Sequence, residues 1–230
     1  MKLREPMRLS EKTTKILQNF TSINQSLHFK EGNTLRTISV MKNVLAEAEI
    51  DEYIPREFAI YDLPQFLNTL SLTNAPTIDV TTDHSHALIR GNASDKTKFF
   101  FCDPSVIVAP PEKQMTLPSV DVEFMLGEQD LRSLLKASSI MQLPDLSVVG
   151  NGNTVEVVVS DRKNDTSNEF NLTVGQTENT FSFNFKIENI KTLIGGYHVS
   201  ISKKNLAKFY SSAYKLTYFI ALEPDSTFDE

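Results

Sequence analysis

Two histidines around a serine are the first residues of this sequence that could do chemistry. Asp83-His84-Ser85-His86 would place two imidazoles on one face of an extended strand, as some metal sites do. No third ligand stands at a suitable spacing, so a polar turn is the simpler interpretation. Gly150-Asn151-Gly152 is typical of a hairpin rather than of a phosphate-binding loop, and no Ser-His-Asp or Cys-His motif is recognisable. We therefore expect no catalytic residue, no metal and no cofactor.

Basic residues recur on one face of two predicted helices. The first helix begins after Ser10 as N-cap and runs to about Asn24. Its polar face, opposite an apolar stripe, carries Lys12, Lys15 and Asn19. A second helix runs from Glu128 to about Gln142, and its polar face carries Arg132 and Lys136. By itself this pattern is typical of a solvated helix surface and does not indicate DNA binding.

The elements that position these helices occur twice in the same order. Each half contains an amphipathic helix, short alternating strands, a second short helix and further strands, and it closes on an aromatic strand before an acid-proline pair. Prolines 104, 110, 111 and 118 mark the segment between the halves as a connector. The sequence predicts an α+β protein with two similar domains, residues 1–105 and 122–230, joined by a connector over residues 106–121.

Local signals also predict details of each half. Asp62 is expected to cap a short helix whose core side includes Leu70 and Leu72. Leu135 and Met141 are expected to face the core from the Glu128 helix, and another short helix is predicted over residues 188–193. The last strands are predicted at residues 197–202 and 215–222.

Composition limits the class of protein. With 230 residues, 40% of them hydrophobic, the chain can bury a substantial core. Its formal net charge of −6 argues against binding nucleic acid through overall charge, so any DNA contact must be local. No run approaches the roughly 18 to 20 apolar residues of a membrane span, and Met1 to Pro6 lacks the apolar core of a signal peptide, so we expect an intracellular protein with no membrane partner. The lone Cys102 is expected to be a buried, inert thiol.

Several short segments occur in the same order as in a known family. They are Thr13-Thr14, Asn19-Phe20, Ile23-Asn24, Phe58-Ala59-Ile60-Tyr61-Asp62-Leu63, Asp103-Pro104-Ser105, Val108-Ala109-Pro110, Glu178-Asn179-Thr180-Phe181, Ile220-Ala221-Leu222-Glu223 and Asp225-Ser226-Thr227. Together with the length and the internal repeat, they make the chain resemble the DNA polymerase sliding clamps of T-even-type bacteriophages and their relatives. The resemblance spans nearly the whole chain, but the strands after Gly150 and the Lys203-Lys204 hairpin match poorly.

The resemblance implies a processivity fold, the DNA-clamp fold. Two similar domains would form each subunit, and three subunits would close into a homotrimeric ring with β-sheets outside and helices lining the hole. Duplex DNA would thread the hole without sequence specificity. Members of this family are not enzymes: they tether the replicative DNA polymerase, are opened by a separate ATP-driven clamp loader and also serve late transcription. For this chain the resemblance implies the cytoplasm of an infected bacterial host.

The resemblance also suggests functional residues. Six residues would face DNA: Lys12, Lys15, Asn19, Arg132, Lys136 and Lys191. Partner tail peptides would dock near the connector and the end of the chain, on Val106, Ile107, Val108, Ile220, Ala221, Leu222 and Pro224. The region near Lys98 and the last strand of each half could contribute subunit contacts.

Simpler interpretations remain open at this point. The basic residues could be ordinary solvated charges, and the apolar ones could merely cover sheet edges. A non-enzymatic, β-rich phage structural or adaptor protein would share the acidic surface, the strands and the oligomer.

Overall fold

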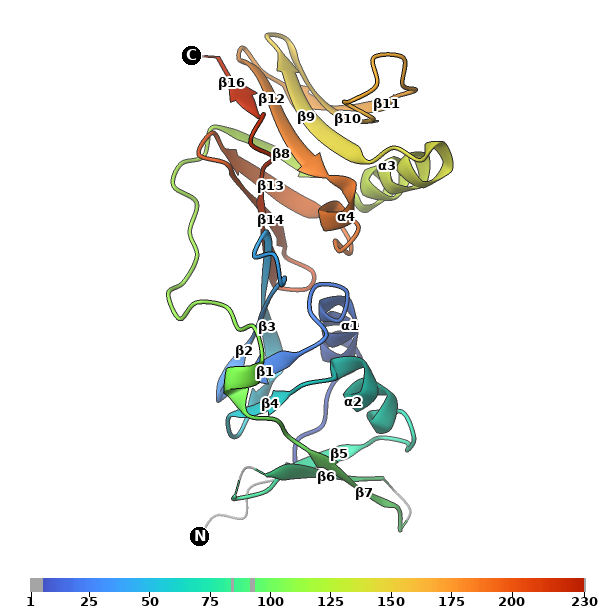
Figure 1. Cartoon of the computed structure of the whole chain (residues 1–230), viewed down its shortest axis with the longest axis vertical. Helices are drawn as coiled ribbons and strands as arrows, with labels where there is room; N and C mark the ends of the chain where they lie inside the picture. The colour runs from blue at the N-terminus through green and yellow to red at the C-terminus, as the bar shows by residue number, and fades with distance from the viewer. Residues whose placement is uncertain (1–5, 84, 92–93, 230) are drawn as a thin grey trace. The chain divides into compact units, whose positions relative to one another are not determined.

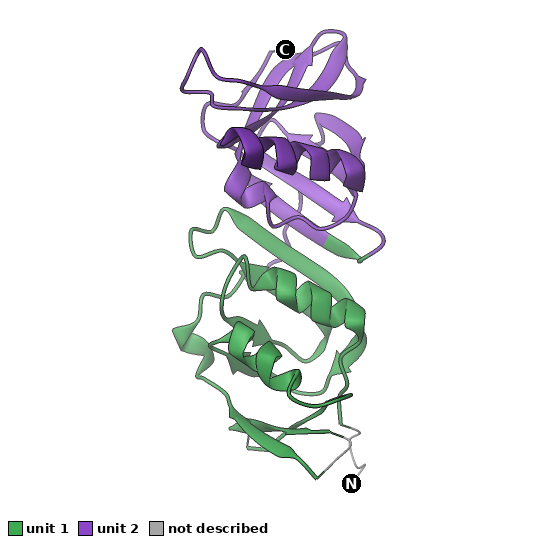
Figure 2. Cartoon of the chain, turned by 90° about the vertical axis from the view of Figure 1, so that its right-hand side faces the viewer, with its two compact units in different colours: residues 1–112, 214–216 green, residues 113–213, 217–230 purple. Residues whose placement is uncertain are grey.

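The computed structural model describes residues 6–83, 85–91 and 94–229, which form two compact units (Figures 1 and 2). Unit 1 comprises residues 1–112 and 214–216, and unit 2 comprises residues 113–213 and 217–230. The boundary between Glu112 and Lys113 lies inside the segment predicted as a connector. In each unit, helices cover one side of the strands (Figure 2). No helix in the described residues is long and apolar enough to cross a membrane.

Unit 1 combines three sets of antiparallel strands with two helices. Its elements are α1 (Glu11–Phe20), β1 (Leu27–Phe29), β2 (Gly32–Ile38), β3 (Val44–Ile54), β4 (Phe58–Ile60), α2 (Leu63–Leu70), β5 (Thr77–Val80), β6 (His86–Arg90), β7 (Lys96–Phe100) and the 3-10 turn η1 (Pro104–Val106). Strand β2 pairs with β3 and β1 pairs with β4, while β6 lies between β5 and β7. Phe29 stacks on Phe58 with ring centroids 4.5 Å apart, and Phe66 of α2 meets Phe29 edge-on.

Short polar side chains set the helix ends in unit 1, as predicted. The Ser10 hydroxyl accepts a hydrogen bond from the Thr13 amide at 3.2 Å, and the Asp62 carboxylate accepts one from the Gln65 amide at 2.8 Å. Helix α1 stops at Phe20 rather than near Asn24. The Thr21 hydroxyl donates back to the Gln18 carbonyl at 2.7 Å, which competes with the regular helical pattern.

Unit 2 is built from two antiparallel sheets. Its elements are β8 (Val122–Leu126), α3 (Glu128–Met141), β9 (Asp145–Asn151), β10 (Thr154–Ser160), β11 (Phe170–Gln176), β12 (Thr180–Lys186), α4 (Ile187–Ile190), β13 (Tyr197–Ser202), β14 (Leu206–Ser211), β15 (Leu216–Ala221) and β16 (Thr227–Phe228). One sheet runs in the order β11-β10-β9-β12-β16, and the other contains β15, β14, β13 and β8 as successive neighbours. The predicted turn at Asn151-Gly152 joins β9 to β10, and Gly152 has φ +81°, a conformation that glycine adopts without strain.

Several local predictions were wrong. Strands β8, β14 and β16 were not predicted, and α4 covers residues 187–190 instead of 188–193. Leu72 was expected in the core, but its side chain is 77% exposed because α2 ends at Leu70. Leu135 and Met141 are only half-buried, since the buried stripe of α3 passes through Leu131, Leu134 and Ser138.

Cys102 is half-buried rather than buried. Its backbone N–H donates to the Ala59 carbonyl at 3.0 Å, which holds the end of the β7 segment against β4. Burial raises the pKa of the Cys102 thiol, so the sulfur stays protonated near neutral pH, in keeping with the expected low reactivity.

Candidate DNA-facing and partner-binding sites

The N-terminus of α1 is fixed to β3 by the half-buried carboxylate of Glu52. This carboxylate accepts the Thr13 hydroxyl at 2.6 Å and also the Ser10 backbone N–H. Burial by itself would raise the pKa of Glu52, but the hydrogen bonds from Thr13 and Ser10 outweigh it and hold the pKa below its ordinary value. The helix therefore has a defined rotation about its axis.

That rotation leaves the three predicted residues of α1 on its outer side. Ile16 and Leu17 are fully buried, whereas Lys15 is exposed and Lys12 and Asn19 are half-buried. The sequence pattern of this helix face is thus confirmed. Contact with DNA stays a prediction.

Helix α3 presents its basic residues under different electrostatic conditions. The Arg132 side chain is 74% exposed and forms an ion pair with Glu128 one turn earlier. Lys136 is exposed, and no carboxylate within the described residues pairs with it. The carboxylate of Glu128 partly compensates the charge of Arg132, so Lys136 carries the less compensated charge of the two.

Lys191 follows α4 and lines a cavity of about 360 Å³ at the C-terminal end of α3. Ser139 and Gln142 of the α3 end share this cavity with Lys191 and Lys186. The Lys186 ammonium is held by the Asp145 carboxylate at 2.6 Å, and this hydrogen bond raises the pKa of Lys186. Lys191 is therefore the more accessible of the two cations.

Three side chains of unit 1 hold the first part of the connector. The buried Asn24 donates from Nδ2 to the Val108 carbonyl at 3.1 Å and to the Ile38 carbonyl at 3.0 Å. Arg36 donates to the Pro111 carbonyl at 2.8 Å. Lys30 pairs with Glu112, which lowers the pKa of Glu112. These contacts join residues far apart in the sequence and place the connector in a defined position on unit 1.

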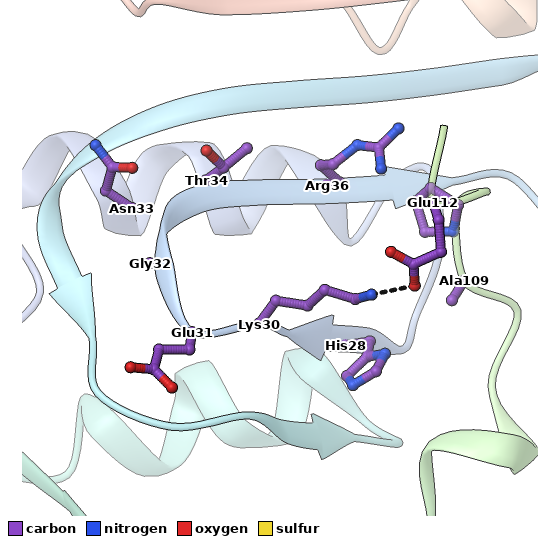
Figure 3. A pocket seen from close by; sticks show the side chains of 10 residues that line it. His28, Lys30, Glu31, Gly32, Asn33, Thr34, Arg36, Ala109 and Glu112 are labelled. Carbon is purple, nitrogen blue, oxygen red and sulfur yellow. Dashed lines mark hydrogen bonds and ion pairs between the residues drawn. The ribbon is translucent and has the colours of Figure 1, made fainter. Parts of the chain in front are cut away.

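A cavity of about 320 Å³ lies between β2 and this anchored connector. Figure 3 shows Lys30 extending across it toward Glu112, with Arg36 on β2 to one side, His28 on β1 to the other, and Ala109 close to Glu112. Its other lining residues are Glu31, Gly32, Asn33, Thr34 and Pro110. Arg36 also pairs with Glu47 at 3.0 Å, and the His28 ring contacts the Glu57 carboxylate at 2.5 Å.

The residues predicted to bind partners differ in accessibility. Val106 is 59% exposed and Val108 is 37% exposed, while Ile107 is half-buried. Near the end of the chain, Pro224 is exposed and Ala221 is half-buried. Ile220 and Leu222 are buried in unit 2 because β15 is a core strand, so they support a surface and do not present one.

The sequence reasoning missed the anchors Asn24, Lys30 and Arg36. A buried asparagine just after a helix is a usable signal, since it must find several hydrogen-bond partners. The partners themselves lie 75 to 84 residues away, and no local pattern encodes them.

The histidine motif shows no metal site in the described part of the chain. His84 lies outside the described residues. Hydrogen bonds from Thr81 and Ser85 lower the pKa of Asp83 to about 2, and the Ser85 hydroxyl lies 2.7 Å from His86 Nδ1. Among the described residues, no group of three His, Cys, Asp or Glu side chains could hold a metal ion.

This fold is that of DNA clamps. PCNA of A. fulgidus, in a structure where it is bound by the C-terminal region of FEN-1, superposes with a TM-score of 0.68 at 12% identity, over 93% of this chain and 96% of that one. At this identity the likeness shows the fold alone. It confirms the predicted α+β clamp fold.

Sequence comparisons identify the family. A family profile described as DNA polymerase processivity factor matches residues 9–109, and one described as gp45 sliding clamp, C terminal, matches residues 123–224. The sliding clamp of Enterobacteria phage T4 is 31% identical over 97% of this chain and 100% of its own length, and that of Escherichia phage RB69 is 30% identical over the same shares. The chain belongs to the phage sliding-clamp family of DNA polymerase processivity factors. The alternative of a phage structural or adaptor protein is thereby set aside.

Proposed function

We propose that three copies of this chain close into a ring around duplex DNA and tether the replicative polymerase to its template. The family membership supports this proposal, and the exposed basic residues on α1 and α3 supply a surface for the DNA. A closed ring stays on DNA without binding it tightly. A protein that was retained by tight contacts could not slide along the duplex. A net charge of −6 suits this mechanism, because only the helix faces need to attract phosphates.

The DNA surface is assigned to Lys12, Lys15, Asn19, Arg132, Lys136 and Lys191. Lysine and arginine attract phosphates on long flexible stems without reading base sequence. Each phosphate contact that is lost should reduce the slope of log affinity against log salt by about 0.9. Arg132 should contribute least per charge among the exposed cations, because Glu128 already pairs with it.

Edge strands are the proposed subunit contacts. Strand β7 is an edge of the β5-β6-β7 sheet, and β11 is an edge of the larger sheet of unit 2. Lys96 and Lys98 lie on β7, whereas Glu169 precedes β11 and Glu156 lies on its neighbour β10. Edge strands have backbone groups that can pair with another chain. The lysines on β7 and the glutamates near β11 would attract each other and favour this pairing between copies.

Partners of the ring are proposed from the family resemblance. The anchored connector with Val106, Ile107 and Val108, and the chain end at Ala221 and Pro224 over the buried Ile220 and Leu222, would receive tail peptides of the polymerase. An ATP-driven clamp loader and late-transcription proteins would use the same surfaces. The chain would act without catalysis, cofactor or metal in the cytoplasm of the infected bacterial host.

Charge reversal tests the DNA surface. A variant with Lys15, Arg132 and Lys136 all changed to Glu should assemble normally but lose loading and stimulation of DNA synthesis. A matched variant reverses three exposed loop lysines, Lys42, Lys163 and Lys204, and changes the net charge equally. If both variants retain the wild-type salt dependence, the assigned helix faces do not contact DNA.

Topology tests enclosure. With a loader and ATP supplied, the protein should remain on closed circular DNA and leave a linear duplex with free ends. Equal retention on the two templates would contradict the ring mechanism while leaving the assigned basic residues untouched.

A further inference from the structure

The end of the chain returns to the sheet of unit 2 after its last core strand. Strand β16 pairs with β12, with Phe228 opposite Phe181 and Thr227 opposite Ser182. The Asp229 amide donates to the Thr180 carbonyl at 2.9 Å, and the Glu223 amide donates to the Asn184 carbonyl at 2.8 Å. Residues 223–229 thus occupy the edge of β12 as an added strand.

Side chains seat this terminal segment at two points. At the first, Asp225 forms an ion pair with Arg162, and Asn184 Nδ2 donates to the Asp225 carbonyl at 3.3 Å. The Ser226 hydroxyl accepts the Asn184 backbone amide at 2.9 Å. A carboxylate at position 225 therefore has a cationic partner, and hydrogen bonds fix the backbone beside it.

At the second point, an aromatic ring lies in a prepared position. The Phe228 ring centroid lies 6.0 Å from that of Phe181 and 6.0 Å from that of Phe183, with interplanar angles of 9° and 16°. The Lys203 ammonium lies 5.4 Å from the centre of the same ring. With the Phe228 ring in place, Phe181 and Phe183 are 2% and 1% exposed, and they also stack on each other with centroids 5.1 Å apart.

Arg162, Phe181, Phe183 and Lys203, with the edge of β12, are called here the β12 groove. The terminal segment is held there mostly by contacts at the protein surface. Its regular pairing is only two residues long, and the Asp225 side chain is 63% exposed, so solvent and salt weaken its ion pair. Short edge strands with exposed hydrogen bonds open at lower free energy than the core.

We propose that the β12 groove is a docking site for an extended segment of a partner protein that carries a carboxylate and, three residues later, a phenylalanine. The chain's own terminal segment occupies the groove in competition with that partner. Two cations flank the groove in a protein of net charge −6, which favours an acidic segment. Strand addition to a sheet edge supplies main-chain hydrogen bonds, and the ring position supplies specificity.

Peptide binding tests the proposal on the full chain. The probe is a labelled pentapeptide, Asp-Ser-Thr-Phe-Asp, the sequence of residues 225–229. Removing the internal competitor with Asp225→Asn and Phe228→Ala should tighten binding of the probe about tenfold or more over wild type. A probe with alanine for phenylalanine should not bind. Adding Lys203→Gln to the double variant should weaken binding several-fold.

Failure to bind more tightly than wild type would overturn the proposal. Hydrogen exchange of the unmodified chain gives an independent measurement. The amides of Glu223 and Asp229 should exchange at least about 100-fold faster than the β12 amides that pair with β9. Equal protection would show that the terminal segment never leaves the groove. If wild type instead forms dimers that the double variant abolishes, the occupant is a second copy, and the partner proposal is wrong.

Discussion

Asn24→Ala is the sharpest test of how unit 1 holds the connector. Asn24 is 7% exposed and makes four hydrogen bonds through its side chain. Nδ2 donates to the Ile38 and Val108 carbonyls, while Oδ1 accepts the Ser26 amide and hydroxyl at 3.0 Å each. The substitution removes all four and leaves polar backbone groups without partners.

The magnitude follows from these contacts. Net hydrogen bonds contribute about 0.5 to 1.5 kcal/mol each, and partial hydration near Ser26 recovers some of the loss, so we expect a cost of about 2 to 3 kcal/mol. With a urea m-value of about 3 kcal/mol/M for a chain of this size, the unfolding midpoint should fall by about 0.7 to 1 M. Hydrogen exchange in residues 107–112 should accelerate, and binding of a polymerase tail peptide should weaken.

Two variants separate the halves of this side chain. Ser26→Ala removes only the hydroxyl contact and should cost about 0.5 to 1 kcal/mol. Asn24→Asp keeps the oxygen that accepts the Ser26 hydrogen bonds. It replaces Nδ2 with an oxygen that repels the Ile38 and Val108 carbonyls, so it should release the connector and preserve the turn at Ser26. If Asn24→Ala behaves like Ser26→Ala, and exchange in the connector is unchanged, then Asn24 does not anchor the connector.

Three further predictions concern stability. Asp145→Ala removes a carboxylate that is only 1% exposed and leaves its cationic partners unpaired, so it should lower the free energy of unfolding in urea by about 3 kcal/mol. Glu128→Ala breaks an exposed pair and should lower it by less than about 1 kcal/mol. Similar costs for the two variants would contradict the role of burial. Because the pKa of Glu52 is lowered in the folded protein, its stabilisation is present above the unfolded value of about 4.3 and is lost as pH falls through the folded pKa. Glu52→Gln should therefore be less stable at pH 7 and lose less stability on acidification, which thermal unfolding from pH 7 to 3 would measure; an unchanged acid profile would count against the Glu52 contacts. Gly150→Ala places a Cβ 2.4 Å from the Phe181 ring and should lower the melting temperature, and an unchanged value would mean that the ring moves freely.

Features encoded by neighbouring residues were predicted well. Ser10 and Asp62 cap helices because their side chains reach amides three residues later, and Asn151-Gly152 turns because glycine adopts a positive φ. The extent of α3 follows from the spacing of its apolar residues. These signals depend only on residues within one or two helical turns.

Features that depend on distant contacts were not predicted. Strand β16 contains one apolar residue and follows a proline, so it forms only because β12 offers an open edge and two phenylalanine rings. Strand β14 was not predicted because the turn before it carries Asn205 and no glycine. Asn205 has φ 62° and reverses the chain after Lys204. The cavity beside β2 depends on a connector held from residues 75 to 84 positions away.

The unlike edges β7 and β11 have a consequence for mixtures of normal and altered chains. In the proposed ring, β7 of one copy would join β11 of the next, so the copies would associate head to tail and each would use one edge for each neighbour. A chain with proline in β7 but an intact β11 would accept one neighbour and refuse the other. A ring that includes such a chain could not close, so a minor fraction of altered chains should inhibit assembly of the normal protein.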